Sequence, residues 1–249
     1  MKAMIVAAGL GTRLRPLTDT LPKALVPVAG IPMLERVIRR LKEAGFTDLT
    51  VNIHHWGEQI LDFLHTHHDF GTTLHISDER GALLDTGGGI RKARSFLDGD
   101  EPFLVHNVDV ITDLDLHAFY QHHRQSHADA TLFTNHRRTS RYLLTDTDGR
   151  LCGWTNRSTG EVLPADLIDP DTRYRTKAFG CVQMLSPAIF QYMDTANLPD
   201  KFSIIPFYIS ICRTAHIQTC SGQSRYWFDI GKPETLAEAE QYLLTHQNS

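Results

Sequence analysis

MKAMIVAAGLGTRLRP, residues 1–16, combines a short apolar run with a glycine-rich turn. The run over residues 2–8 is almost continuous, which is typical of a strand that is covered on both faces of a parallel sheet. Gly9 and Gly11 follow it, at the point where α/β sheets bind their ligands. Because glycine has no Cβ, the backbone N–H groups of such a turn can approach phosphate oxygens closely. The stretch therefore predicts an α/β fold with an anion-binding loop after its first strand.

Strands and helices alternate in the residues that follow. Apolar side chains within residues 33–44 recur at i, i+3, i+4 and i+7, which predicts an amphipathic helix that Gly45 ends. Further strands are predicted at residues 49–54, 73–77 and 103–106, and further helices at residues 58–67 and 90–97, the last of them entered from the three glycines at 87–89. This alternation predicts a Rossmann-like, doubly wound sheet that is flanked by helices.

The pattern changes in the second half of the chain. Strands are predicted at residues 130–135, 142–146, 151–155 and 174–185, with Asp148-Gly149 as a hairpin signal. A buried helix is predicted at residues 204–212, two strands that close the sheet at residues 215–220 and 226–230, and a last helix at residues 233–244, which opens with proline. We therefore expect a single α/β domain over residues 1–249, with a mixed sheet and a small inserted antiparallel lobe.

Composition restricts the class of protein. The chain has 249 residues, of which 41% are hydrophobic and 22% charged, and its net charge of −4 offers no broad cationic surface to a nucleic acid. The four cysteines include no C-x-x-C pair, which favours a reduced, intracellular protein. No apolar run approaches the roughly 18 residues of a membrane span, and the run at residues 2–8 is too short for a signal peptide. We expect a cytoplasmic protein without a nucleic-acid or membrane partner.

Basic residues follow the two glycines of the first loop. Leu14 stands where the dinucleotide-binding fingerprint has its third glycine, and no Gly-Lys-Ser/Thr follows, so the loop matches neither that fingerprint nor a Walker A loop. Arg13 offers a planar fork to a phosphate, and Lys23, which follows Pro22, offers a mobile point charge. This order of residues predicts a loop that binds phosphate groups.

Residues 9–23, GLGTRLRPLTDTLPK, resemble the signature of the sugar-1-phosphate nucleotidyltransferases. The resemblance continues at DTGGG (residues 85–89), NVD (residues 107–109) and WFDIGKPE (residues 227–234), and so spans nearly the whole chain. The first motif is highly specific and the others support it. The TGGG form and the short length are most similar to the small uridylyltransferases that act on N-acetylmuramic acid 1-phosphate and related hexose 1-phosphates. Val108 stands where the family commonly has glycine.

This resemblance implies an enzyme that transfers a nucleotidyl group from a nucleoside triphosphate, with UTP favoured, to a sugar-1-phosphate. Pyrophosphate is released and a nucleotide-sugar is formed. The resemblance also divides the domain into a nucleotide-binding part over about residues 1–112, a sugar-binding part over about residues 113–225, and a closing part over residues 226–249 with a metal-ligand strand and the last helix. We expect a monomer or a small homo-oligomer.

The same resemblance implies the site residues. Arg13 and Lys23 are the implied catalytic residues. The nucleotide is implied to contact Ala8, Gly9, Gly11, Thr12, Arg13, Lys23, Thr86 and Gly88. The sugar phosphate is implied to contact Asn107, Asn156, Lys177 and Gly180, of which the last three lie in the inserted lobe.

Two carboxylates are candidates for a metal site. Joining two anionic phosphates is opposed by charge repulsion, so the reaction calls for a cation and fixed basic groups rather than a covalent nucleophile. Mg²⁺ prefers one or two carboxylates together with phosphates and water. Asp109 and Asp229 each lie at the end of a predicted strand, and the resemblance implies that they hold Mg²⁺. No general base is needed, because a phosphate monoester is already largely ionised near neutral pH.

Two other functions stay open. Asp113-Leu114-Asp115 is a D-x-D pattern, which also occurs in metal-dependent glycosyltransferases that consume a nucleotide-sugar, although the loop at residues 9–23 has no place in such an enzyme. A non-catalytic nucleotide-sugar sensor would be favoured by the loss of the charged site residues, but all of them are present. The fourteen histidines show no zinc-binding spacing, and we expect them mainly at the surface.

Overall fold

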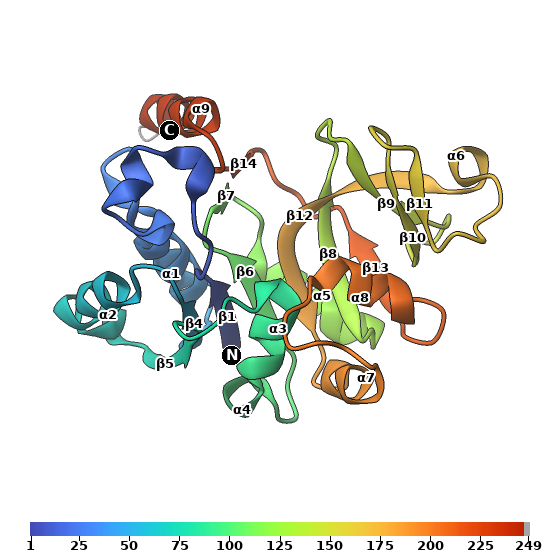
Figure 1. Ribbon diagram of the computed structural model, residues 1–249, viewed down its shortest axis with the longest axis horizontal. Coiled ribbons are helices and arrows are strands. Elements are labelled where there is room, and N and C mark those ends of the chain that lie inside the picture. The colour runs from blue at the N-terminus through green and yellow to red at the C-terminus, as the bar shows by residue number, and fades with distance from the viewer. Residues whose placement is uncertain (247–249) are drawn as a thin grey trace.

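A ten-stranded mixed sheet forms the centre of the molecule (Figure 1). The computed structural model describes residues 1–246. The strands follow the order β11-β10-β9-β12-β6-β1-β4-β5, while β8 pairs with both β12 and β13. β1, β4, β5 and β6 run parallel, whereas β12 is antiparallel to β6, β8 and β9. The strands are β1 (Lys2–Val6), β4 (Asp48–Ile53), β5 (Thr73–Asp78), β6 (Phe103–Asn107), β8 (Ala130–Asn135), β9 (Arg141–Thr145), β10 (Leu151–Asn156), β11 (Glu161–Leu163), β12 (Arg175–Leu185) and β13 (Ile217–Cys220).

Helices cover both faces of this sheet. They are α1 (Met33–Glu43), α2 (Gly57–Thr66), α3 (Asp85–Lys92), α4 (Arg94–Leu97), α5 (Leu116–Ser126), α6 (Pro170–Arg173), α7 (Ile189–Thr195), α8 (Ile204–Ile211) and α9 (Pro233–His246). Ala3 and Ile5 of β1 pack into one hydrophobic cluster with α1 and α5, whereas Met4 packs into a second cluster with α3, α7 and α8. Successive side chains of a strand point to opposite faces, so the two clusters lie on opposite sides of the sheet. The predicted Rossmann-like α/β fold is confirmed.

The long strand β12 joins the central sheet to a smaller antiparallel part. Its residues 182–185 pair with β6, and its residues 175–177 pair with β9. The strands β9, β10 and β11 therefore extend the sheet away from α1 and α2, at the right of Figure 1. The hairpin turn predicted at Asp148-Gly149 joins β9 to β10, with φ +86° at Gly149.

Some predicted elements differ from those observed. The strand predicted at residues 226–230 forms as β14 (Trp227–Asp229), but it does not close the central sheet; it pairs with β7 (Val110–Thr112) in a separate two-stranded sheet. The helix predicted from residue 90 begins earlier, at Asp85, so that the three glycines lie inside α3. The helices α5 and α7 were not predicted. None of the helices within residues 1–246 is long and apolar enough to cross a bilayer.

Two of the histidines lie inside the protein rather than at its surface. His106 on β6 is 3% exposed, and His123 on α5 is 1% exposed. The Nδ1 atom of His123 lies 2.8 Å from the hydroxyl of Thr131, and its Nε2 atom lies 3.1 Å from the hydroxyl of Ser186. Burial lowers the pKa of each imidazole to about 4, so both rings are neutral at pH 7.

The low pKa values of these histidines predict a loss of stability in mild acid. An imidazole of the unfolded chain takes up its proton near pH 6.5, whereas the buried rings do so only near pH 4. As the pH falls through this window, protonation therefore stabilises the unfolded state relative to the folded state. Each ring should lower the free energy of unfolding by roughly 1.4 kcal/mol per pH unit between pH 6 and 5. In urea titrations His123→Gln should remove about half of this combined slope. The exposed His117 on the same helix provides the control, because H117Q should keep the full slope; equal slopes for H123Q and wild type would contradict the prediction.

Candidate functional site

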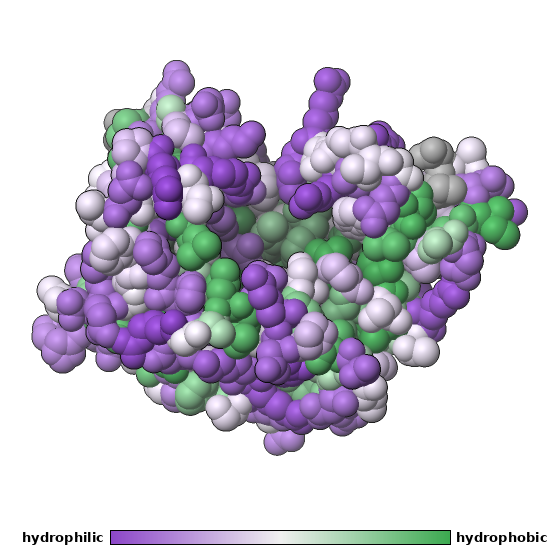
Figure 2. Space-filling model, in the orientation of Figure 1, coloured by the Kyte–Doolittle hydropathy of each residue, from purple (hydrophilic) through white to green (hydrophobic). Residues whose placement is uncertain are grey.

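Two cavities meet at the loop that follows β1. The smaller one, of about 300 Å³, is bordered by this loop, by Lys23 and by the residues at the end of β6, including Asp109. The larger one, of about 840 Å³, lies among β9, β10, β12 and the start of α8, and Asp229 lines it. Arg13 lines both cavities and so marks the place where they join. Figure 2 shows the hollow between the part of the molecule that carries α1 and α2 and the part that carries β9–β11.

The loop is held by close contacts with the residues that follow it. Gly11 adopts φ +65°, in the left-handed region that favours glycine. A Cβ at this position would lie 3.0 Å from carbon atoms of both Lys23 and Thr18. The Thr18 hydroxyl donates a hydrogen bond of 2.8 Å to the Gly11 carbonyl. Glycine at this position therefore lets Lys23 lie directly against the loop, and Gly9 and Gly11 both line the smaller cavity.

A buried pair of polar side chains supports the start of the loop. Asn52 at the end of β4 is 1% exposed, and Glu79 after β5 is 0% exposed. The Oδ1 atom of Asn52 accepts hydrogen bonds from the N–H groups of Ala7 (2.6 Å) and Ala8 (3.3 Å), and its Nδ2 atom donates to Oε1 of Glu79 (2.7 Å). Oε2 of Glu79 accepts from the N–H of Leu84 at 3.2 Å. The N–H of Ala8, a predicted nucleotide contact, is thus directed at Asn52, and no sequence motif had indicated the Asn52–Glu79 pair.

The glycines of α3 allow this helix to pack against the segment before α8. The N–H of Gly88 donates to the Phe202 carbonyl at 3.2 Å, and a Cβ on Gly88 would collide with the carbonyl of Asp200. The Thr86 hydroxyl accepts a hydrogen bond from the N–H of Ile204 at 3.1 Å. Of the two predicted nucleotide contacts in this motif, Thr86 borders the smaller cavity, whereas Gly88 is buried in the packing between α3 and this segment.

Asp229 ends β14, and Asp109 directly precedes β7, the strand that pairs with β14. Because β14 pairs with β7, the N–H of Ile230 donates a hydrogen bond of 2.8 Å to the Asp109 carbonyl, which places Asp229 beside Asp109. The Lys23 ammonium forms an ion pair with Oδ2 of Asp109. Oδ1 of Asp229 is buried and has no hydrogen-bond partner in the described chain, residues 1–246. Burial and the negative charge of Asp109 raise the pKa of Asp229.

This pair of carboxylates fits a divalent cation that prefers oxygen ligands. A buried carboxylate oxygen without a donor is unfavourable in the protein alone, and a cation shared with a second carboxylate would satisfy it. Among the residues that the structure places, no three His, Cys, Asp or Glu side chains gather into a metal-binding cluster. Two carboxylates are the number that Mg²⁺ takes from a protein when substrate phosphates and water complete its shell.

Two arginines lie close to these carboxylates. A Cβ on Gly231 would lie 2.7 Å from Nη2 of Arg13, so the guanidinium of Arg13 rests against this glycine. The guanidinium of Arg137 lies 4.5 Å from the centre of the Trp227 ring and donates a hydrogen bond of 3.0 Å to the Phe179 carbonyl. Both arginines line the larger cavity and both counteract the raised pKa of Asp229. The junction of the cavities therefore carries positive charge at fixed positions.

Cys181 of β12 also lines the larger cavity. Its burial, reinforced by the negative charges of Asp109 and Asp229, raises the pKa of its thiol to about 12. The thiol is therefore protonated at neutral pH, and a protonated thiol is a poor nucleophile. This cysteine does not supply a covalent route for group transfer.

The predicted sugar-phosphate contacts are only partly brought together. Asn107 borders the smaller cavity. The carboxamide oxygen of Asn156 accepts a hydrogen bond of 3.1 Å from the backbone of the turn after β10, and the ammonium of Lys177 lies 3.3 Å from a serine hydroxyl. The carbonyl of Gly180 accepts a hydrogen bond of 2.9 Å from the indole of Trp227. Asn156, Lys177 and Gly180 are not among the residues that line the two cavities.

The basic residues that do line the larger cavity include Arg137 and Lys232. Lys232 stands in the WFDIGKPE stretch, three positions after Asp229, so the sequence contained a signal for it. Arg137 belongs to no motif, and its position follows from the path of the chain between β8 and β9. Both cations line the larger cavity, whereas Lys177, the predicted cation of the sugar-phosphate site, is not among its lining residues.

The D-x-D carboxylates have structural partners. Asp113 accepts a hydrogen bond of 2.9 Å from Nε of Arg225, and Asp115 caps the N-terminus of α5 by accepting one of 2.8 Å from the N–H of Ala118. An aspartate at the N-cap satisfies a helix N–H that would otherwise lack a partner. The D-x-D pattern therefore stabilises local structure, and this removes the observation that favoured a glycosyltransferase.

Comparisons with known proteins point to one family. Residues 2–150 match the Nucleotidyl transferase family. N-acetylmuramate alpha-1-phosphate uridylyltransferase from Neisseria meningitidis serogroup B is 50% identical over 122 residues, which make up 49% of this chain and 52% of that protein. Mannose-1-phosphate guanylyltransferase 1 from Arabidopsis thaliana is 29% identical over 242 residues, 94% of this chain and 62% of that protein. The structure of UDP-glucose pyrophosphorylase from Acinetobacter baumanii has a TM-score of 0.76 at 18% identity, covering 98% of this chain and 94% of that one, and so shares its fold.

The family match includes most of the residues that line the smaller cavity. The chain spans about half the length of the Neisseria relative. The matched residues 2–150 include the loop after β1, Lys23 and Asp109. This is more than half of the chain, and the fold of the remainder agrees with the solved pyrophosphorylase. The chain therefore belongs to the nucleotidyl transferase family.

Proposed function

We propose that this protein transfers a uridylyl group from UTP to a sugar-1-phosphate, with Mg²⁺ as its cofactor, and forms a UDP-sugar and pyrophosphate. The observation that carries the proposal is the position of Arg13 and of the Asp109–Asp229 pair at the junction of the two cavities. A nucleotide in the smaller cavity and a sugar in the larger one would bring their phosphates together at this junction. Fixed positive charge at that place lowers the repulsion between the phosphates.

In the proposed reaction Arg13 and Lys23 bind the triphosphate. Asp109 and Asp229 would hold Mg²⁺, which would supply further positive charge to offset the phosphates. An oxygen of the sugar phosphate attacks the α-phosphorus in line and forms the new P–O bond, while the bond to the leaving pyrophosphate breaks and its electron pair leaves with it. The attacking phosphate is already ionised near neutral pH, so no side chain has to remove a proton.

The sugar phosphate is proposed to meet Arg137 and Lys232, which line the larger cavity. Arg137 is well suited to this role, because its stacking on Trp227 and its hydrogen bond to the Phe179 carbonyl fix the direction of the guanidinium before a substrate binds. A fixed guanidinium can offer two parallel N–H groups to a phosphate. This replaces the contact that the sequence analysis assigned to Lys177.

Two relatives support the choice of substrates. The Neisseria uridylyltransferase acts, by its name, on N-acetylmuramate alpha-1-phosphate, and a protein of the same name from Caulobacter vibrioides is 43% identical over 111 residues. We therefore propose UTP and N-acetylmuramate 1-phosphate as the substrates. Because the Arabidopsis relative is a mannose-1-phosphate guanylyltransferase, the substrate pair to exclude is GTP with mannose 1-phosphate.

The proposal is tested by pyrophosphate release. Purified protein with Mg²⁺ is given each of the common nucleoside triphosphates together with each member of a panel of sugar-1-phosphates. We expect release with UTP and N-acetylmuramate 1-phosphate, none without the sugar, and none after EDTA has removed the cation. Release with GTP and mannose 1-phosphate alone would replace the uridylyl assignment with a guanylyl one. The absence of pyrophosphate for every pair would overturn the enzymatic proposal.

A further inference from the structure

The larger cavity has apolar walls on two sides. Leu143, Trp154 and Leu163 are direct neighbours in the antiparallel register of β9, β10 and β11, so they form one row across the sheet, and all three line the cavity. Ile205 and Ile209 of α8 also line it. An unsubstituted hexose offers only its small C–H faces to an apolar wall, whereas an acyl group or an alkyl arm adds apolar surface that such a wall can cover. These walls fit a sugar with apolar substituents, such as an acyl group or an alkyl ether arm.

A polar row runs beside the apolar one on the same strands. Arg141 precedes Leu143 by two positions on β9 and therefore shares its face of the sheet. In the register Arg141 lies opposite Asn156, which lies opposite Glu161, and both Arg141 and Glu161 line the cavity. A charged group thus stands directly next to the apolar row, at the border of the space that the sugar is proposed to fill.

The guanidinium of Arg141 has no partner within the protein. It makes no hydrogen bond or ion pair in the part of the chain that the structure describes, residues 1–246, and its own backbone N–H meets the Thr139 hydroxyl at 3.3 Å. Of the other two arginines of the cavity, Arg137 is fixed by its contacts with Trp227 and the Phe179 carbonyl, and Arg13 is proposed to bind the triphosphate. Arg141 is therefore a cation beyond those that the sugar phosphate requires.

We propose that Arg141 determines sugar specificity by binding a carboxylate that the sugar carries on a short alkyl arm. The inference rests on the proposed function and assigns to one residue the preference for N-acylated sugar 1-phosphates with such an acidic arm. A guanidinium presents two parallel N–H groups that match the two oxygens of a carboxylate. The carbon atoms of the arm then pack on the neighbouring apolar row. N-acetylmuramate 1-phosphate has this arm, and N-acetylglucosamine 1-phosphate is the same sugar without it.

The test compares these two sugars on variants of one residue. In Arg141→Gln the charge is lost while polarity is kept, so kcat/KM for N-acetylmuramate 1-phosphate should fall by about 10- to 100-fold, mainly through KM. The value for N-acetylglucosamine 1-phosphate should change less than about threefold, because that sugar has no carboxylate to lose. Arg141→Lys keeps the charge but not the planar fork, and should give an intermediate loss. Equal losses on both sugars, or no loss on either, would overturn the proposal.

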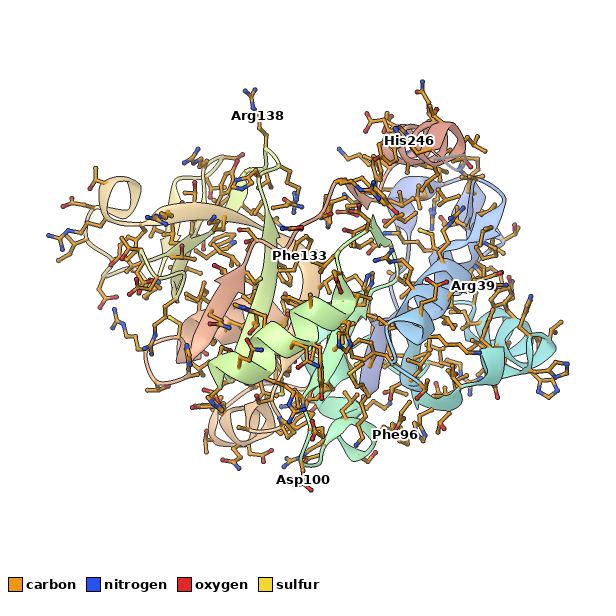
Figure 3. The ribbon with its side chains drawn as sticks, turned by 180° about the vertical axis from the view of Figure 1, so that it is seen from behind. Arg39, Phe96, Asp100, Phe133, Arg138 and His246 are labelled. Carbon is orange, nitrogen blue, oxygen red and sulfur yellow. The ribbon has the colours of Figure 1, made fainter. Side chains whose placement is uncertain are left out.

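Arg138 provides the matched control. It lies three positions before Arg141, in the connection between β8 and β9, but it projects away from the ribbon into solvent (Figure 3), and it is not among the residues that line the larger cavity. Arg138→Gln removes the same charge from a nearby position, so a general effect of charge would appear in both variants. We expect R138Q to leave the ratio of kcat/KM for the two sugars unchanged. A fall in that ratio equal to the one for R141Q would mean that the effect does not come from a contact in the cavity.

A binding measurement separates this inference from the proposed function. Calorimetric titration of each sugar 1-phosphate into the protein needs no turnover. Wild type should bind N-acetylmuramate 1-phosphate more tightly than N-acetylglucosamine 1-phosphate, and R141Q should bind both alike. A protein that binds in this way without releasing pyrophosphate would contradict the proposed function and keep the role of Arg141. Pyrophosphate release together with equal binding of the two sugars by wild type would contradict the role of Arg141 alone.

Discussion

Replacing Asp229 with Asn should abolish pyrophosphate release and at the same time raise the melting temperature. The catalytic loss, which we expect to be roughly 10³-fold or more, follows from the removal of one of two carboxylates that are proposed to hold the cation. The gain in stability follows from the free protein, where Oδ1 of Asp229 is buried without a donor and the carboxylate faces the negative charge of Asp109. An amide of the same shape removes that repulsion.

The sign of the stability change depends on pH. Burial and Asp109 raise the pKa of Asp229, so the folded state favours the protonated carboxyl more than the unfolded state does. Below the ordinary pKa of 3.8, this preference contributes fully to the free energy of unfolding. The contribution is lost as the pH rises through the raised pKa of Asp229. Asn carries no charge at any of these pH values and therefore avoids this loss. The melting temperature of D229N should exceed that of wild type by roughly 2 °C at pH 7, and the difference should shrink as the solution is made acidic.

The variant Asp109→Asn should be equally inactive but less stable than wild type. The Lys23 side chain is only 9% exposed, and Asp109 is its ion-pair partner. An ammonium group that stays buried without its counter-charge lowers the free energy of unfolding by roughly 1–3 kcal/mol. Two inactive variants with opposite changes in melting temperature would show that the loss of activity does not come from unfolding. The assignment fails if either variant retains pyrophosphate release at the wild-type rate, or if both change stability in the same direction.

Replacing Asn52 with Leu should destabilise the protein by about 3 kcal/mol or more. Asn52 and Leu are of similar size, but Leu leaves the N–H groups of Ala7 and Ala8 and one oxygen of the buried Glu79 without partners. These groups lie at the start of the phosphate-binding loop, so the KM for the nucleotide should rise as well. Urea denaturation gives the first quantity, and pyrophosphate release at varied UTP gives the second.

The control for this variant is Thr50→Val. Thr50 lies on the same strand, β4, and is as buried as Asn52, but its hydroxyl does not support the loop. A similar loss of stability in T50V would mean that β4 tolerates no change at this depth, and the role of Asn52 in the loop would then be unsupported. A rise in KM that is confined to N52L would show that the pair of Asn52 and Glu79 positions the loop.

Local patterns were sufficient to predict most of the fold. The apolar run at residues 2–8 and the i, i+3, i+4 spacing in residues 33–44 report burial directly, and the structure has β1 and α1 there. The position of β14 could not be predicted in this way, because its pairing with β7 joins residues far apart in sequence. The three glycines of α3 were interpreted as a helix entry, whereas they lie inside the helix, where Gly88 gives space to the carbonyl of Asp200.

The site was predictable where a motif carries several charged residues in order. The residues Arg13, Lys23, Asp109 and Asp229 were all indicated by short motifs, and the structure gathers them at one junction. The residues that hold the loop in place from neighbouring strands belong to no sequence motif. Asn52 and Glu79 act through backbone N–H groups of another strand, and a contact of that kind depends on the register of the sheet rather than on neighbours in sequence. The larger cavity was hardest to predict, because much of its wall consists of rows of side chains across three strands.

The pairing of β7 with β14 also has a consequence for synthesis of the protein. Asp109 is present once the first half of the chain has left the ribosome, but its partner, Asp229, is contributed by the strand just before α9. A nascent or truncated chain that lacks this strand presents one carboxylate instead of two. Chains that stop before this strand should therefore be catalytically silent, so that activity appears only after β14 has been synthesised.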